Sequence, residues 1–128
     1  MITTHYTANT TYPELCDLDN VERRERLILE LIQWLLDEGW EVFREAYYKQ
    51  FFTTERKWRA DIIARKQDVD RIAVIEIQGG SWNSGRHTRG KGYADDLRKS
   101  NCVNFEGQTF LAFTYEMLED REYEKYLI

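Results

Sequence analysis

Two short stretches decide the fold that the sequence predicts, WRADIIA at residues 58–64 and IAVIEIQGG at residues 72–80. Each contains a run of Ile, Val and Ala typical of a buried strand, and a polar turn separates them. Each also carries a carboxylate that a hydrophobic core does not require, Asp61 in the first and Glu76 in the second. A short hairpin would place the strands side by side, with Glu76 and Gln78 pointing to the same side of the sheet.

Asp61 and Glu76 would repel each other on adjacent strands unless a cation neutralised them. Hard divalent ions such as Mg²⁺ prefer carboxylate oxygens, so the pair predicts a metal site. The structural alternative is an ion pair within the sheet, for which Arg59 and Arg65 lie close to Asp61 in sequence. The presence of both carboxylates favours the metal site over this alternative.

The overall composition narrows the class of protein. A chain of 128 residues, with 42% hydrophobic and 32% charged residues, is typical of one soluble globular domain and excludes a disordered chain. The N-terminal residues lack the basic region and apolar core of a signal peptide, so we expect a cytoplasmic protein with no membrane partner. Cys16 and Cys102 fit no metal-ligand spacing and are expected to be free thiols.

The charge is unevenly distributed along the chain. The net charge of -5 argues at face value against a nucleic-acid partner. Between Arg56 and Lys99, however, there are 11 Lys and Arg against 6 Asp and Glu, whereas the remainder holds 7 against 17. Local field matters more than total charge for phosphate binding. A basic region around two carboxylates therefore favours a metal-dependent enzyme that acts on phosphodiesters.

Periodicity and capping signals predict the elements that precede residues 58–64. Residues 1–18 show no period and are expected to be an irregular lead-in. Asp19, followed three residues later by Glu22, resembles a capping box, and residues 21–38 then read as an amphipathic helix. Residues 41–52 predict a strand rich in aromatic side chains. The sequence thus predicts a helix followed by a three-stranded antiparallel meander.

A glycine-rich segment, residues 79–92, holds five of the seven glycines in the chain. A loop this rich in glycine can bring its backbone close to a ligand, although a flexible surface loop would account for the glycines as well. The segment also carries Trp82, which we interpret as a loop or core anchor rather than a base-stacking residue. Its four side-chain donors are Arg86, His87, Arg89 and Lys91.

The last third of the chain predicts two helices and one strand. Residues 93–101 read as a short helix, residues 109–114 as an apolar strand and residues 116–127 as a terminal helix. Asp96 and Lys99 are one turn apart in the first of these helices, so a surface ion pair would account for Lys99. The complete order of helix, three strands, helix, strand and helix predicts an α/β fold with a mixed sheet.

This order, with an acid in one central strand and an acid-x-polar triplet ending the next, resembles the PD-(D/E)xK nuclease superfamily. A more specific likeness lies in KWRAD at residues 57–61, IEIQGGSW at 75–82, GRHTRGKGY at 85–93 and DLRKSN at 96–101. These runs resemble VRR-NUC-like or Holliday-junction-resolvase-like endonucleases of phage and bacteria, over residues 25–118. The resemblance implies a restriction-endonuclease-like αβββαβ core, in a bacterial or phage-infected cell.

The resemblance also implies roles for individual residues. Asp61 and Glu76 would hold Mg²⁺ or Mn²⁺, with the backbone carbonyl of Ile77 as a third ligand. Glu30 in the first helix would correspond to the additional helical acid of many members. Glu25 is the alternative for that role, because one sequence does not determine the register of the helix.

The chain departs from the superfamily at Gln78, which stands where a lysine is usual. A neutral amide neither serves as a general base nor supplies positive charge. Either Gln78 orients a water that a bound cation has acidified, or Lys99 reaches the site from the following helix and restores the charge. We interpret Gln78 as positioning the nucleophile and Lys99 as a phosphate contact.

The sequence therefore predicts a metal-dependent endonuclease that hydrolyses DNA, with selectivity for branched or junction DNA left open. The four donors of the glycine-rich segment, Arg86, His87, Arg89 and Lys91, would contact flanking phosphates. For His87, a general acid and a structural donor are the alternative roles. Two alternatives remain, a non-catalytic nucleic-acid-binding module of the same fold, which Gln78 favours, and a nuclease directed at RNA. Symmetric cleavage of two strands would suit a homodimer.

Overall fold

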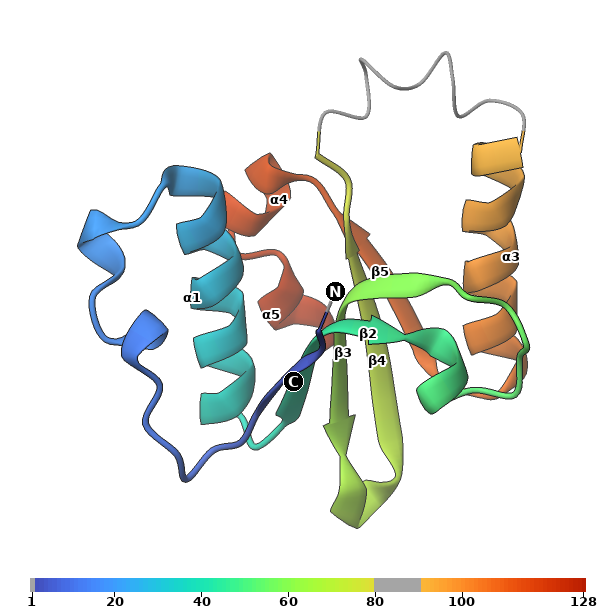
Figure 1. Ribbon diagram of the computed structural model, residues 1–128, viewed down its shortest axis with the longest axis horizontal. Helices are drawn as coiled ribbons and strands as arrows, with labels where there is room; N and C mark the ends of the chain where they lie inside the picture. The colour runs from blue at the N-terminus through green and yellow to red at the C-terminus, as the bar shows by residue number, and fades with distance from the viewer. Residues whose placement is uncertain (1, 80–90) are drawn as a thin grey trace.

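A five-stranded sheet with helices on both sides forms the centre of the molecule (Figure 1). The computed structural model describes residues 2–79 and 91–128. The strands, which follow one another across the sheet in chain order, are β1 (Thr4–Tyr6), β2 (Glu41–Tyr47), β3 (Arg59–Lys66), β4 (Arg71–Ile77) and β5 (Thr109–Phe113). Neighbouring strands from β1 through β4 pair antiparallel, and β5 pairs parallel with β4. The predicted mixed α/β class and antiparallel meander are confirmed.

The helices lie in two layers, one on each side of the sheet (Figure 1). One layer holds α1 (Arg23–Asp37), α4 (Tyr115–Glu119) and α5 (Tyr123–Tyr126), and the other holds α3 (Lys91–Phe105). Over residues 2–79 and 91–128, none of the helices has the length and apolar character needed to cross a membrane. Both Cys16 and Cys102 are free thiols, as expected.

The start of α1 differs from the capping box that the sequence predicted. Glu22 is the N-cap, and its carboxylate accepts hydrogen bonds from the backbone N–H groups of Arg24 and Glu25 at 3.0 and 3.1 Å. Asp19 instead lies in a 3₁₀ turn, Leu18–Asn20. The predicted cap at Asp19 is therefore wrong, because Glu22 stands nearer the free N–H groups of the first turn.

The N-terminal segment is more ordered than its lack of periodicity suggested. Within the expected irregular lead-in, residues 4–6 form β1 and pair with β2, and Tyr6 is buried. Thr3 Oγ1 also donates to the backbone carbonyl of Glu45 at 2.8 Å. A three-residue strand has too few side chains to show a period, so pairing with β2 is what orders it.

Three other element boundaries differ from those predicted. The strand expected at residues 41–52 ends at Tyr47, where the chain enters a 3₁₀ helix, η3 (Tyr48–Gln50). The terminal helix expected at 116–127 is divided into α4 and α5, and Arg121 between them has a left-handed φ of 54°. The helix expected at 93–101 is longer at both ends, as α3 shows.

The core consists of two apolar layers separated by the sheet. On the α1 side, Ile62 and Ile75 from the central strands pack against buried leucines of α1. On the α3 side, Ile63 and Val74 pack against Val103. Alternate residues of β3 and β4 therefore point to opposite layers, as expected for strands buried on both faces.

The alternation of faces shifts by one residue toward one end of β2 and β3. In β2, Val42 belongs to the α1-side core whereas Ala46 belongs to the α3-side core. In β3, Ile62 lies in the α1-side core and Ala60 in the α3-side core. Glu45, at the shift in β2, has a φ of 60°, a left-handed conformation that is costly for a side-chain-bearing residue. The sheet is thus irregular beside the segment that contains Asp61.

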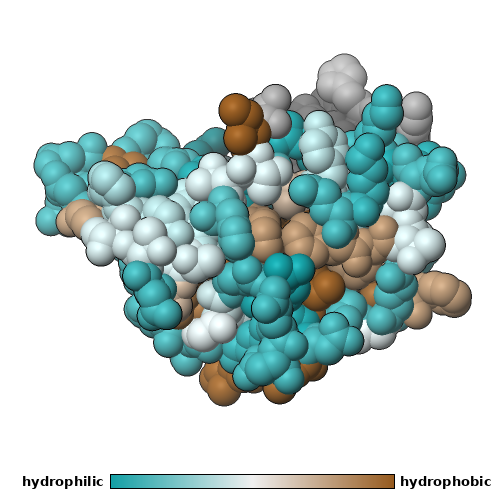
Figure 2. Space-filling model, turned by 60° about the horizontal axis from the view of Figure 1, so that its bottom comes forward, coloured by the Kyte–Doolittle hydropathy of each residue, from teal (hydrophilic) through white to brown (hydrophobic). Residues whose placement is uncertain are grey.

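The surface seen in Figure 2 is mainly hydrophilic, with smaller hydrophobic areas near its centre and along one edge. Large hydrophobic side chains exposed in the described part of the chain include Val69, Phe105 and Ile128. These residues come from separate parts of the chain, and exposed hydrophobic side chains are normal on a globular surface.

Candidate functional site

Asp61 and Glu76 lie where the regular ladder between β3 and β4 ends. The last pair in the ladder is Ile62 opposite Ile75. Beyond that pair, the Ile77 N–H donates to Asp61 Oδ2 at 2.7 Å, and the Asp61 N–H donates to Glu76 Oε1 at 3.3 Å. Each carboxylate therefore accepts from a backbone N–H of the opposite strand. The structure brings together the two acids that the sequence predicted to be neighbours.

Glu76 is a charged residue inside the α3-side core, with only 8% of its surface exposed. Its Oε2 accepts a hydrogen bond of 2.5 Å from the hydroxyl of Tyr48, whose own surface is fully buried. Tyr48 lies in η3, directly after β2, and its ring packs edge-on against Trp58 at a centroid distance of 5.7 Å. A buried carboxylate needs such a donor, because an unpaired charged oxygen is costly to remove from water.

Lys99 reaches the same carboxylate from α3. Its Nζ lies 3.6 Å from Glu76 Oε2 and 5.7 Å from the centroid of the Tyr48 ring, and 18% of its side chain is exposed. Among the ion pairs of residues 2–79 and 91–128, Lys99 pairs with Glu76 and not with Asp96, its neighbour one turn away. The structure therefore places Lys99 at the paired acids, as the second of the two sequence interpretations requires.

The charges around Glu76 act on its proton affinity in opposing directions. Burial raises the pKa of Glu76, and the nearby Asp61 acts the same way, whereas the Tyr48 hydrogen bond and the Lys99 charge oppose this rise. Burial, followed by the charge of Glu76 and its hydrogen bond, raises the pKa of Tyr48 far above its usual value. Tyr48 therefore remains a protonated hydrogen-bond donor throughout the physiological range.

The acids expected from α1 do not join this site. Glu30 lies in the helix layer on the opposite side of the sheet, where it lines a hollow together with Arg26 and Arg121. Glu25 forms a two-pronged ion pair with Arg44 of β2, with N–O distances of 2.6 and 2.7 Å. Within the described ranges, no group of three or more His, Cys, Asp and Glu side chains could hold a metal ion. Neither glutamate of α1 therefore joins Asp61 and Glu76 as a third acidic residue.

Ile77 and Gln78 continue directly from Glu76. Ile77 is the last residue of β4, and its N–H is the group bound to Asp61. Gln78 follows the strand, and its backbone N–H donates to the carbonyl of Phe113 at 2.8 Å. The chain therefore keeps its extended course beside β5 for one residue more, so Gln78 stays next to the paired acids in the fold.

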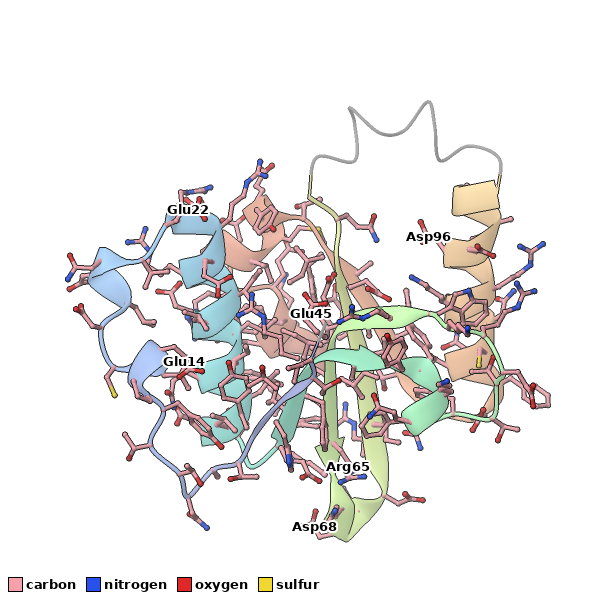
Figure 3. The ribbon with its side chains drawn as sticks, viewed as in Figure 1. Glu14, Glu22, Glu45, Arg65, Asp68 and Asp96 are labelled. Carbon is pink, nitrogen blue, oxygen red and sulfur yellow. The ribbon has the colours of Figure 1, made fainter. Side chains whose placement is uncertain are left out.

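The predicted phosphate contacts fall mostly outside the described residues. Arg86, His87 and Arg89 lie outside the described ranges, and Lys91 is the first residue of α3. The end of β4 and the start of α3 lie at the same end of the molecule (Figure 1). Asp96, labelled on α3 in Figure 3, is close enough to Tyr48 for its charge to contribute to the raised pKa of that residue.

Sequence reasoning missed Tyr48 as part of the site. The predicted strand 41–52 treated Tyr48 as one of several aromatic residues, and nothing in that pattern separates it from Tyr47. Tyr48 is directed toward Glu76 because the strand ends at Tyr47 and η3 begins. A correct prediction of that strand end would have been the one sequence signal for the role of Tyr48. Contact between residues 28 positions apart depends on the packing of η3 beside β4 and therefore leaves no local pattern.

A separate hollow of about 640 Å³ is lined by residues of α3 and by Thr53, which follows η3. Its lining residues are Thr53, Arg98, Asn101, Cys102, Phe105 and Glu106, so it does not include the paired acids. Burial and the charge of Glu106 raise the pKa of Cys102, which argues against a reactive thiolate there. Asp61, Glu76 and Lys99 are therefore not part of this hollow.

The fold and site together define a mixed α/β protein with two carboxylates from adjacent strands and a lysine from a covering helix. Comparisons of the chain with protein-family models, with curated proteins and with solved structures found no match.

Proposed function

We propose that this protein is a metal-dependent endonuclease of restriction-endonuclease-like fold that hydrolyses DNA phosphodiester bonds. The observation that carries the proposal is the convergence of Asp61, Glu76 and Lys99 from β3, β4 and α3. Two carboxylates beside one lysine supply both ligands for a hard cation and a positive group for a phosphate. The order of elements around them agrees with the αβββαβ core that the sequence resemblance implies.

The donor set fits Mg²⁺ or Mn²⁺. Mg²⁺ commonly takes only one or two protein carboxylates, with waters and substrate phosphates completing its coordination, so a third acid is not required. Asp61 and Glu76 would hold the ion, with the carbonyl of Ile77 as a further oxygen ligand. Glu30 is not part of the proposed set, because it lies across the sheet. When bound, the ion would acidify a water and neutralise phosphate charge.

The remaining residues of the site have proposed roles on the substrate side. Lys99 would contact the phosphate beside the paired acids, which is the charge that Gln78 does not supply. Gln78 would orient the attacking water through its amide. The donors of the glycine-rich segment, Arg86, His87, Arg89 and Lys91, would bind flanking phosphates, so DNA affinity should fall steeply with added salt.

Cleavage assays with labelled DNA test this function directly. The intact protein and Asp61→Asn would be incubated with duplex, single-stranded, flap and four-way-junction DNA in Mg²⁺ or Mn²⁺. Asp68→Asn is a matched control, because Asp68 is an exposed residue of the β3–β4 turn (Figure 3). We expect cutting that requires metal, is lost in Asp61→Asn and persists in Asp68→Asn. RNA substrates tested in parallel separate the RNA-directed alternative.

A non-catalytic nucleic-acid-binding module is the second candidate. The observation that favours it is that Tyr48, Lys99 and two backbone N–H groups already contact three of the four carboxylate oxygens of the paired acids. The neutral Gln78 in place of a lysine points the same way. Junction binding without cutting by either protein would support this candidate and contradict the nuclease.

A further inference from the structure

We propose that Tyr48 is a positioning residue that fixes the Glu76 carboxylate for cation binding. The inference rests on the proposed metal-dependent function and assigns a role to a residue outside the metal ligands. Tyr48 would act through Glu76, without touching the metal or the substrate.

The position of the Tyr48 hydroxyl is determined by the core. The ring is fully buried and packs against Trp58 at 5.7 Å and Phe52 at 6.2 Å between centroids. The Tyr48 backbone N–H donates to the carbonyl of Trp58 at 3.1 Å, which holds η3 against the start of β3. A ring held on several sides has little freedom at either side-chain torsion. Its hydroxyl is therefore a fixed donor 2.5 Å from Glu76 Oε2.

This donor divides the two oxygens of Glu76 between different tasks. Oε2 accepts from the Tyr48 hydroxyl and lies beside the Lys99 ammonium. Among residues 2–79 and 91–128, the contact of Oε1 is the longer one of 3.3 Å with the Asp61 N–H. The two oxygens of Asp61 also differ, because Oδ2 accepts a hydrogen bond from the Ile77 N–H at 2.7 Å. Within the part of the chain that the structure describes, Glu76 Oε1 and Asp61 Oδ1 are thus the oxygens that we assign to a cation.

Lys99 alone would not hold Glu76 as firmly. Its Nζ is 3.6 Å from Oε2, beyond hydrogen-bond distance for good geometry, and it lies at the end of a long flexible side chain. Tyr48 has only two side-chain torsions and a packed ring. Hydrogen bonds to a ligating carboxylate orient it, and losing such a partner typically weakens metal affinity about 10- to 100-fold.

Direct measurement of Mn²⁺ binding tests the role of Tyr48 without relying on activity. Titration calorimetry or electron paramagnetic resonance would compare the intact protein with Tyr48→Phe, which removes one hydroxyl and keeps the ring. Tyr6→Phe is the matched control, since Tyr6 is also buried and its hydroxyl donates to a carboxylate, that of Glu14, at 3.1 Å. We expect roughly 10- to 100-fold weaker binding in Tyr48→Phe and unchanged affinity in Tyr6→Phe.

The outcomes separate this role from the metal site itself. Equal Mn²⁺ affinity of Tyr48→Phe and the intact protein would overturn the positioning role and leave the metal site standing. Failure of the intact protein to bind Mn²⁺ would overturn both. If Tyr48→Phe does not fold, Mg²⁺ titration of the intact protein should still change tyrosine absorbance in the near ultraviolet, and Asp61→Asn should abolish that change. The absence of any tyrosine signal at saturating Mg²⁺ would refute the role of Tyr48.

Discussion

A single buried carboxylate, Glu76, connects four separate parts of the chain. It belongs to β4, accepts from the backbone of β3 at Asp61, accepts from Tyr48 in η3 and lies beside Lys99 of α3. Burial alone would favour the neutral acid, and these partners offset that cost. Burying the Glu76 carboxylate costs free energy of folding, and its partners recover part of that cost. A buried acid with this many partners is more consistent with a functional site than with a role in packing.

Replacing Lys99 should separate a phosphate contact from a structural ion pair. In Lys99→Ala at saturating Mg²⁺, we expect cleavage to fall roughly 100-fold, because a positive group facing transition-state charge is lost. Arg98→Ala is the control, since Arg98 is the neighbouring cation of α3, half-exposed and paired with Asp95. Single-turnover cleavage rates measure the effect. Near-normal cleavage by Lys99→Ala would rule out Lys99 as the substitute for the missing lysine.

At the scale of elements, α1 is joined to the sheet by both packing and charge. Its buried leucines contact the sheet, and the Glu25–Arg44 pair connects the first turn of the helix to β2. The expected alternative role for Glu25, as the helical acid of a metal site, would require breaking this pair. Glu25 is therefore assigned a structural role, in which its ion pair with Arg44 attaches α1 to β2.

The Glu25–Arg44 pair predicts a pH-dependent contribution to stability. The hydrogen bonds from Arg44 lower the pKa of Glu25 below its unfolded value of about 4.3. The stabilisation is therefore present above the unfolded value and is lost as pH falls through the lower, folded pKa. Glu25→Gln should reduce the free energy of unfolding at pH 7 by about 0.5 kcal/mol, a value discounted for screening because 41% of the Glu25 side chain is exposed.

Urea unfolding of both proteins at pH 7 and near pH 2 checks this contribution. The two proteins should differ at the higher pH and converge at the lower one, where Glu25 is protonated. Arg44→Gln and the double variant complete the cycle and separate the pair from effects on either residue alone. A difference that persists undiminished at low pH would contradict the ion-pair origin.

At the scale of the whole molecule, cation binding should stabilise the native state. The site requires β3, β4, η3 and α3 to be assembled, so the unfolded chain does not contain it. At Mn²⁺ about 100 times above its dissociation constant, the stabilisation would be about 2.7 kcal/mol. For a domain of this size, this corresponds to a rise in melting temperature of roughly 10 °C.

Thermal melts with and without Mn²⁺ measure that rise. Asp61→Asn should lose the shift, while Asp68→Asn, changed in the exposed β3–β4 turn, should keep it. No shift in the intact protein would favour the non-catalytic binding module over the nuclease.

The order of most elements and the nearness of Asp61 to Glu76 were predictable from the sequence. Both acids lie in apolar runs joined by a short turn, and a hairpin between such runs leaves few alternative registers. The boundaries were less predictable, as the cap at Glu22 and the break at Arg121 show. Capping and turn conformations depend on which polar group is nearest, which a periodic pattern does not record.

The sequence by itself determined the mixed α/β class, the antiparallel meander and the pair of acids, because strand periodicity and hairpin closure are local properties. Only the tertiary structure decided which side of the sheet each helix covers. That placement put Lys99 beside Glu76, left Glu30 on the opposite face and turned Tyr48 toward the acids. An amphipathic helix shows which of its faces is buried, but both faces of this sheet are apolar, so the helix pattern does not choose between them.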